Sequence, residues 1–258
     1  MTQLLELNRL TVRFHGVVAV DGVDMTFEDG KIYGLIGTNG AGKSTIINLI
    51  SGAVRPTGGA ILLRGRHIEG LPSHRIAALG VTRTFQNLRL FGGFTALENV
   101  VTARQSRKRT ALSQILLTTP RFRRTEEDLR REALDCLRQV GLEDYANQRA
   151  DSLPYGLQRR LEIARCLALE PDFLMLDEPA AGMNPRESLQ LAEDIRAIHR
   201  ARPEMTILLI EHDMKVVMGL CEYIYTMATG KCIAAGTPAE VRASEEVVRA
   251  YLGGRYYA

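Results

Sequence analysis

The chain has 258 residues, 45% of them hydrophobic, and a formal charge of +3 from 33 basic and 30 acidic residues. That length can build the core of one large domain or two small ones, and the charge balance does not by itself indicate nucleic-acid binding. No apolar run approaches the roughly 20 residues of a membrane span. The first residues also lack the layout of a signal peptide, so we expect a soluble, cytoplasmic protein.

Residues 1–30 alternate between apolar and polar side chains, as at Leu5 and Leu7. This alternation is typical of half-buried strands, and glycines interrupt it at three places. The pattern predicts short antiparallel strands that break at Gly16, Gly22 and Gly30.

Residues 37–45 read Gly-Thr-Asn-Gly-Ala-Gly-Lys-Ser-Thr, which fits the G-x-x-x-x-G-K-[ST] pattern of a phosphate-binding loop. The glycines let the backbone pass close to an anion, and the amides of residues 40–44 can point at phosphate oxygens. Lys43 can then reach the β- and γ-phosphates, and the Ser44 hydroxyl can ligate Mg²⁺. The candidate nucleotide-binding residues of the loop are Thr38, Asn39, Gly40, Ala41, Gly42, Lys43, Ser44 and Thr45.

The residues on either side of the loop have the order that such a loop requires. Residues 31–36 have the pattern of a buried strand, and residues 44–50 that of a helix whose N-terminus would face the phosphates. The sequence therefore predicts that the chain binds a nucleoside triphosphate.

In the middle of the chain the sequence pattern changes from that of strands to that of helices. We expect a strand at 59–65, a helix at 72–79 and a strand at 81–85 that ends on Gln86. From about residue 95 to 141, helical spacing replaces the strand signals and predicts a separate helical lobe. Residues 104–124 carry seven basic side chains and no acidic one. A solvated loop or a surface that faces an acidic membrane partner would account for them.

Strand and helix patterns alternate again from residue 157 onward. We expect helices at 157–169 and 186–200, strands at 173–176 and 206–210, a strand pair around 223–235, and helical segments at 238–252. Continuous apolar strands that alternate with helices are typical of a parallel sheet covered on both faces.

Two carboxylates follow the apolar strand at 173–176. Phosphoryl transfer needs charge neutralisation and a positioned nucleophile, so we assign Asp177 to the Mg²⁺ beside Ser44 and Glu178 to the attacking water. His212 follows the next strand, at the edge where ligands bind to such sheets, and can contact the γ-phosphate there.

These motifs occur together in one known family. The chain resembles the ATP-binding subunits of ABC transporters over nearly its whole length, through residues 37–45, Gln86, and residues 153–160, 174–179 and 211–213. The resemblance implies that Gln86 is a catalytic and metal-linked glutamine and that Phe14 stacks on adenine. It also implies that residues 180–184 cross a dimer interface.

The same resemblance makes residues 153–157 the signature loop, which closes on the ATP of a second subunit. The chain departs from the family here, because Pro154 replaces a serine, Tyr155 a glycine and Leu157 a glutamine. Proline offers neither a hydroxyl nor a backbone N–H group. Of the two expected nucleotide contacts, Pro154 and Gly156, we therefore expect Gly156 and the helix start to contribute more.

The subfamily is indicated by residues 83–87, 160–165, 179–185, 211–214 and 250–253. They look like those of the ATPases that drive uptake of branched-chain, hydrophobic amino acids. No feature of this chain contacts the transported solute, so other family members remain as alternatives. These are the ATPase of a urea or amide importer, the ATPase of a lipopolysaccharide-type exporter, and a soluble ABC-type ATPase.

We therefore expect an α/β fold, a P-loop NTPase core with a mixed, largely parallel sheet, an N-terminal antiparallel β portion and an inserted helical lobe. The expected domains are a core of residues 1–94 and 170–258 and a lobe of residues 95–169 that holds the signature loop. The implied cofactors are ATP and Mg²⁺. The implied partners are transmembrane permease subunits, a second ATPase subunit and, indirectly, a solute-binding protein, at the cytoplasmic face of the cell membrane and without nucleic acid.

Overall fold

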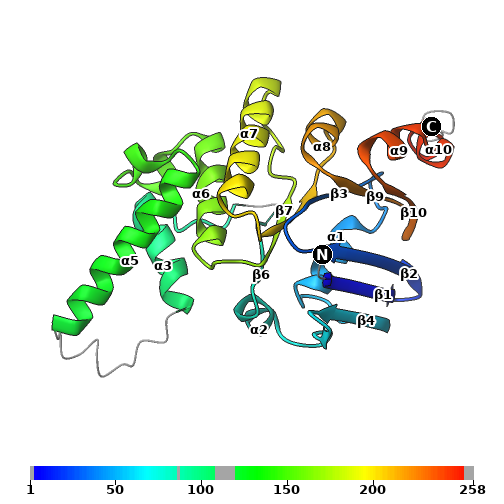
Figure 1. Cartoon of the computed structure of the whole chain (residues 1–258), viewed down its shortest axis with the longest axis horizontal. Helices are drawn as coiled ribbons and strands as arrows, with labels where there is room; N and C mark the ends of the chain where they lie inside the picture. The colour runs from blue at the N-terminus through cyan, green and yellow to red at the C-terminus, as the bar shows by residue number, and fades with distance from the viewer. Residues whose placement is uncertain (1–2, 86–87, 108–119, 253–258) are drawn as a thin grey trace. The chain divides into compact units, whose positions relative to one another are not determined.

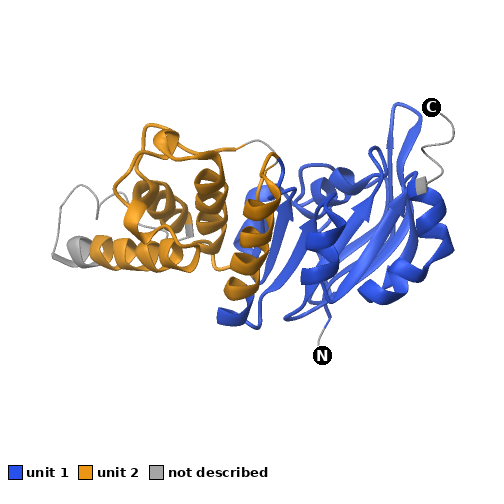
Figure 2. Cartoon of the chain, turned by 90° about the horizontal axis from the view of Figure 1, so that it is seen from above, with its two compact units in different colours: residues 1–83, 172–181, 199–258 blue, residues 84–171, 182–198 orange. Residues whose placement is uncertain are grey.

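A computed structural model describes residues 3–85, 88–107 and 120–252 (Figure 1). The chain divides into two compact units (Figure 2). The first unit contains residues 1–83, 172–181 and 199–258, and the second contains residues 84–171 and 182–198. The domain bounds expected from the sequence, with a lobe of residues 95–169, stay a prediction.

The first unit opens with an antiparallel sheet of four strands in the order β2-β1-β4-β5. Its strands are β1 (Gln3–Phe14), β2 (Val17–Glu28), β4 (Gly58–Leu63) and β5 (Arg66–His67). The prediction of short strands is wrong for β1 and β2, which have 12 residues each. Gly22 lies inside β2 at a φ of 62°, next to a shift in the register between the two strands, so it belongs to a bulge and does not end the strand.

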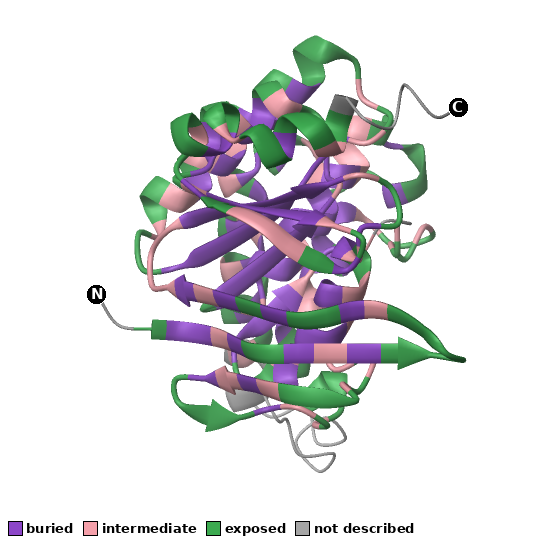
Figure 3. Cartoon of the chain, turned by 90° about the vertical axis from the view of Figure 1, so that its right-hand side faces the viewer, coloured by how far each residue is buried: buried purple, intermediate pink, exposed green. Residues whose placement is uncertain are grey.

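The second sheet of this unit has six strands in the order β10-β9-β3-β8-β7-β6. Its strands are β3 (Ile32–Gly37), β6 (Val81–Arg83), β7 (Phe173–Asp177), β8 (Thr206–Ile210), β9 (Tyr223–Ala228) and β10 (Lys231–Gly236). All neighbours are parallel except β10, which runs antiparallel to β9. Every residue of β3, β7 and β8 is buried, which confirms the mixed α/β fold (Figure 3).

One apolar core joins the two sheets to helix α1 (Lys43–Ile50). Phe27 of β2 is a fully buried member of this core, with its ring 5.0 Å from that of Tyr33 and 5.2 Å from that of Phe173. Burial of aromatic rings in edge-to-face pairs contributes strongly to core stability. The packing fixes β3 and α1, and thereby the two ends of the phosphate loop between them.

The remaining helices of the first unit are short: α2 (Ser73–Ala78), α8 (Met214–Leu220), α9 (Pro238–Ala243) and α10 (Glu245–Leu252). The sequence pattern did not predict α8, since seven residues are too few to establish a helical period. Strand β6 ends at Arg83, two residues before the predicted end. Gln86 lies outside the described residues.

The second unit is helical, as predicted for the middle of the chain. It contains α3 (Ala96–Arg107), α5 (Pro120–Gln139), α6 (Tyr155–Leu167), the single turns η1 (Glu143–Tyr145) and η2 (Ala150–Ser152), and most of α7 (Pro185–Ala201). Across the described ranges of the chain, no helix combines the length and the apolar character that a membrane crossing needs.

A solvated loop does not explain the basic residue Arg104. Its side chain is buried on α3 and forms salt bridges with Glu132, at 2.6 Å, and with Glu170, at 2.7 Å. Its guanidinium also donates to the carbonyl of Ala168 at 3.1 Å. Arg104 therefore ties α3 to α5 and to the segment after α6. Residues 108–119 of the basic stretch lie outside the described residues.

Candidate functional site

The loop between β3 and α1 has a backbone that only glycine can adopt at three positions. Gly37, Gly40 and Gly42 have φ values of 151°, 77° and 100°. A Cβ atom at Gly37 would lie 2.2 Å from the carbonyl oxygen of Met227, and one at Gly42 would lie 2.7 Å from that of Ala19. The loop is therefore held tightly against neighbouring backbone, and its shape depends on these glycines.

Lys43 folds back over this loop. Its ammonium group donates to the carbonyls of Gly37, at 2.7 Å, and Thr38, at 3.0 Å, and the residue is only 6% exposed. Burial lowers the pKa of Lys43, while the nearby charges of Glu178 and Asp177 act in the opposite direction. A buried cation held at a loop of this shape is placed to neutralise a bound anion.

The first turn of α1 completes an anion-binding arrangement. Gly42 is the N-cap, and no side chain caps the first N–H groups of the helix within the described part of the chain. These N–H groups have no intrahelical acceptor, so they remain available to a ligand at the positive end of the helix. Ser44 is exposed at this turn, and Ala41 is buried beneath the loop.

Asp177 and Glu178 lie where β7 ends. Asp177 is the last residue of the strand and is buried, and it pairs in register with Ile210 of β8. Glu178 has a φ of 48°, a left-handed conformation that glutamate rarely adopts, and its N–H donates to the Ile210 carbonyl at 2.9 Å. Such strain persists only where surrounding structure enforces it, and it is common at functional sites.

His212 meets Glu178 directly after β8. The two side chains are joined by a contact of 2.6 Å between Nε2 of His212 and Oε1 of Glu178. Because β3, β8 and β7 are neighbours in the sheet, the phosphate loop, His212 and the two carboxylates all lie at the carboxyl end of adjacent strands. The structure therefore brings together the predicted residues Lys43, Asp177, Glu178 and His212 at one edge of the sheet.

Glu211 is a further buried member of this edge. Its carboxylate accepts hydrogen bonds from the backbone N–H of Ala180, at 2.7 Å, and of His212, at 3.2 Å. Burial raises the pKa of Glu211. It holds the segments after β7 and β8 together, and the sequence offered one signal for it, a carboxylate directly after the apolar run 206–210.

The other predicted residues lie elsewhere. Phe14 is the last residue of β1 and is exposed. Pro154 and Gly156 belong to the second unit, where Pro154 is the N-cap of α6 and its side chain forms no capping hydrogen bond. Gly156 and Pro154 line a cavity of about 360 Å³ beside Met183 and the start of α7.

A buried polar network holds the start of α6. Arg159 donates to the hydroxyl oxygen of Tyr155 at 3.0 Å, to the carbonyl of Phe85 at 3.0 Å and to the carboxylate of Glu162 at 3.2 Å. Glu162 in turn accepts from the N–H of Phe85 at 3.0 Å, and burial raises the pKa of Glu162. The network connects the first turn of α6 to the backbone just before Gln86. Opposite charges three residues apart inside an apolar helix pattern were its signal in the sequence.

Comparison with known proteins identifies close relatives. Residues 20–181 match the model of the family described as ABC transporter, and residues 231–257 match that described as branched-chain amino acid ATP-binding cassette transporter. The high-affinity branched-chain amino acid transport ATP-binding protein LivG of Escherichia coli strain K12 is 49% identical over 97% of this chain and 98% of its own. The corresponding protein BraF of Pseudomonas aeruginosa is 47% identical over the same shares.

A solved structure also matches the fold. The ADP conformation of MJ1267, an ATP-binding cassette of an ABC transporter, is 26% identical, with a TM-score of 0.84 over 98% of this chain and 100% of that chain.

Proposed function

The chain belongs to the ABC transporter family, and we propose that it is the ATP-hydrolysing subunit of an importer of branched-chain, hydrophobic amino acids. One observation carries the solute class. The chain matches a branched-chain amino acid cassette at residues 231–257, a segment outside the ATP-binding motifs, and is nearly half identical to LivG. The catalytic motifs alone are shared with urea importers and with lipopolysaccharide-type exporters, so they do not distinguish these alternatives.

ATP is proposed to bind at the phosphate loop. The first N–H groups of α1 and the ammonium of Lys43 would hold the phosphate oxygens, with Thr38, Asn39, Gly40, Ala41, Gly42, Ser44 and Thr45 forming the rest of the cradle. The requirement for glycine at positions 37 and 42 supports this role, since any Cβ there would displace the loop. The Phe14 ring would stack on the adenine.

The donor groups at the strand ends fit Mg²⁺. This ion prefers oxygen ligands, and it usually takes only one or two from the protein because waters and phosphates supply the rest. Ser44 is exposed at the start of α1, and the charge of Asp177 acts to raise the pKa of Lys43 beside it. The Ser44 hydroxyl and the Asp177 carboxylate would hold the ion, with Gln86 as a further ligand. When bound, Mg²⁺ neutralises charge on the phosphates during transfer.

Hydrolysis would depend on Glu178 and its partner. The carboxylate of Glu178 would orient the attacking water, and the 2.6 Å contact with His212 would fix that carboxylate while the imidazole reaches the γ-phosphate. The left-handed backbone of Glu178 supports this assignment, because it directs the side chain toward the end of β8.

A second subunit would complete each ATP site. Gly156 and the N-terminus of α6 would contact the γ-phosphate that Lys43 of another copy, or of a close relative, holds. Pro154 would contribute shape and no hydrogen bond, since it lacks an N–H group. The cavity beside Gly156 leaves this helix start accessible.

Permease subunits would dock on the second unit and hold the chain at the cytoplasmic face of the membrane. Phe91 and Phe94 are exposed by 46% and 47%, and their rings lie 5.5 Å apart. The guanidinium of Arg165 lies 5.1 Å from the Phe91 ring. Exposed aromatic pairs of this kind mark interaction surfaces, so this pair supports a docking site for a permease segment. A solute-binding protein would act only through the permease.

Uptake by source cells tests this function. Cells whose only copy of the chain is wild type or Glu178→Gln would be given labelled leucine, isoleucine, valine and urea. We expect the variant to lose uptake of the three amino acids and to keep urea uptake. Loss of urea uptake alone would identify urea, and not the amino acids, as the transported solute. Uptake of all four compounds by the variant would contradict a role in these importers.

A further inference from the structure

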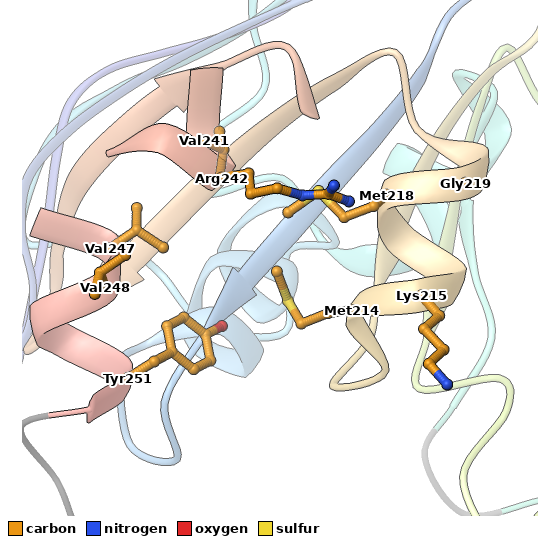
Figure 4. A pocket seen from close by; sticks show the side chains of 9 residues that line it. All are labelled: Met214, Lys215, Met218, Gly219, Val241, Arg242, Val247, Val248 and Tyr251. Atoms are coloured by element: carbon orange, nitrogen blue, oxygen red, sulfur yellow. The ribbon is translucent and has the colours of Figure 1, made fainter. Parts of the chain in front are cut away.

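A large cavity opens on the first unit among α8, α9 and α10 (Figure 4). We call it the C-terminal pocket. Its volume is about 760 Å³, and its walls are mainly apolar, formed by Met214, Met218, Val241, Val247, Val248 and Tyr251. Val248 and Tyr251 are exposed although they are large and apolar. A cavity of this size and character fits a ligand larger than a single amino acid, and methionine side chains adapt to ligands of varied shape.

The charges at this pocket are of one sign. Lys215 and Arg242 are the charged residues among those that line it, and no carboxylate does. Arg242 points from α9 toward α8, whereas Lys215 points away from the other labelled side chains (Figure 4). In the described parts of the chain, neither side chain forms a salt bridge or a hydrogen bond. The guanidinium of Arg242 therefore stands beside apolar walls with its hydrogen-bond donors available.

We propose that the C-terminal pocket binds a carboxylate that carries an apolar acyl chain, with the head group on Arg242 and the chain against the methionines of α8 and the apolar side chains of α10. This chemistry satisfies the cation and covers the exposed apolar surface at the same time. The inference does not depend on which solute the importer carries.

A transported amino acid fits this pocket less well. Its carboxylate could pair with Arg242, but its ammonium group would meet two like charges and no acceptor carboxylate in the lining. An anion without a cationic group avoids this cost.

The pocket touches two elements that lead to the ATP site. Helix α8 begins directly after His212, and its N-cap Asp213 accepts a hydrogen bond from the N–H of Lys215 at 2.8 Å. On the other wall, α9 packs against β9, and Met227 of β9 pairs in register with Gly37, where the phosphate loop begins. A ligand in the pocket therefore contacts elements that position His212 and the start of the phosphate loop, and we expect it to change the rate of ATP hydrolysis.

Nuclear magnetic resonance of the full chain, labelled with ¹³C in its methionine methyl groups, tests the site. Dodecanoate below its micelle concentration should shift the Met214 and Met218 signals, whereas those of the buried Met175 and Met205 should stay in place. Replacing each methionine by leucine assigns the signals. Dodecyltrimethylammonium, which has the same chain and the opposite charge, and leucine serve as comparison probes.

Matched variants locate the head group and the chain. Arg242→Gln should weaken dodecanoate binding at least about tenfold, because it removes a charge-assisted pair. Arg249→Gln makes the same charge change on α10, where Arg249 pairs with the exposed Glu245 outside the pocket, and should leave binding unchanged. Val248→Asp puts a carboxylate on an exposed part of the wall and should abolish binding without disturbing the core.

Several results would overturn the proposal. Equal binding of the cationic probe would show unspecific hydrophobic contact, and tighter binding of leucine would make the pocket a site for the amino acid. No shift at Met214 and Met218 would remove the site. If dodecanoate binds only after deletion of residues 253–258, the end of the chain itself occupies the C-terminal pocket. Binding that leaves ATP hydrolysis unchanged would refute the link to the ATP site.

Discussion

The two units form their functional surfaces in different ways. In the first unit the phosphate loop depends on backbone conformation, because Gly37 and Gly42 leave no room for a Cβ atom. In the second unit the start of α6 depends on side chains, since Arg159 links Tyr155 to Glu162 and to the backbone of Phe85.

This difference indicates which of the two surfaces tolerates amino-acid substitutions. A backbone-built loop requires particular residues at fixed spacing, and the phosphate loop of this chain follows the family pattern throughout. A side-chain network, by contrast, can hold the start of a helix even where the residues there differ from the family pattern. The Tyr155 ring lies against Gly182, where an added Cβ would be 3.5 Å from it, and its hydroxyl accepts from Arg159. This explains how residues 153–157, the proposed signature loop, keep the start of α6 although Pro154 and Tyr155 stand where the resemblance leads us to expect a serine and a glycine.

The largest effect is expected at Glu178, the proposed catalytic carboxylate of the first unit. Glu178→Gln should slow ATP hydrolysis at least about 100-fold, because the amide cannot accept a proton from the attacking water. ATP affinity should stay, since Lys43 and the loop are unchanged. Phosphate release and equilibrium dialysis measure the two quantities. Glu204→Gln, at an exposed position of the same unit, is the matched control. Hydrolysis near the wild-type rate in Glu178→Gln would remove this glutamate from the mechanism.

The next effect concerns the network of the second unit. Arg159→Met leaves Glu162 buried without its cation and should lower the free energy of unfolding by about 3 kcal/mol. Arg159→Met with Glu162→Leu should recover part of that loss. Urea unfolding measures both. Arg138→Met breaks an exposed pair with Glu143 and should change little. Equal losses in the single and double variants would mean that the buried pair does not interact.

A smaller effect is expected from one methyl group in the phosphate loop. Gly42→Ala should reduce ATP affinity about tenfold or more, because a φ of 100° and a contact of 2.7 Å with the Ala19 carbonyl impose a strain of roughly 1–3 kcal/mol. Gly219→Ala, in helix α8, where no atom of the described residues outside that helix's own backbone lies within 4 Å of the new Cβ, should keep affinity and gain up to about 1 kcal/mol in stability. Equal ATP affinities in the two variants would contradict the backbone account of the loop.

The smallest effect is expected at the N-cap of α6. Pro154→Ser supplies a capping hydroxyl and a backbone N–H group, so it should stabilise the helix by about 1 kcal/mol and leave hydrolysis unchanged or raised. Thermal unfolding and phosphate release are the measurements. A collapse of activity would mean that the proline itself shapes the loop.

The first unit was the easier to predict. Its loop and the strands β7 and β8 follow from local signals, because a buried parallel strand is a continuous apolar run and a phosphate loop requires glycine at fixed positions. The prediction of a break at Gly22 was wrong because a glycine pattern does not distinguish a bulge from a turn. Helix α8 is too short to show a period.

Contacts between residues that are far apart in the chain could not be predicted from the sequence. The carbonyl of Phe85 and the guanidinium of Arg159 are 74 residues apart in the chain, and nothing local identifies their pairing. For the same reason Arg104 was interpreted as part of a solvated stretch, although its partners Glu132 and Glu170 bury it. The tie of Glu211 to Ala180 likewise joins two strand ends that only the fold brings together.

Light scattering of the Glu178→Gln chain tests most directly whether surfaces of the two units, on two different copies, complete one ATP site. With saturating ATP and Mg²⁺, the account predicts a particle with twice the 28.6 kDa mass of one chain. Removal of the nucleotide should return it to a monomer, and so should Gly156→Glu in the same background, since a carboxylate there would repel the γ-phosphate. A mass that stays at that of one chain at saturating ATP would contradict the claim.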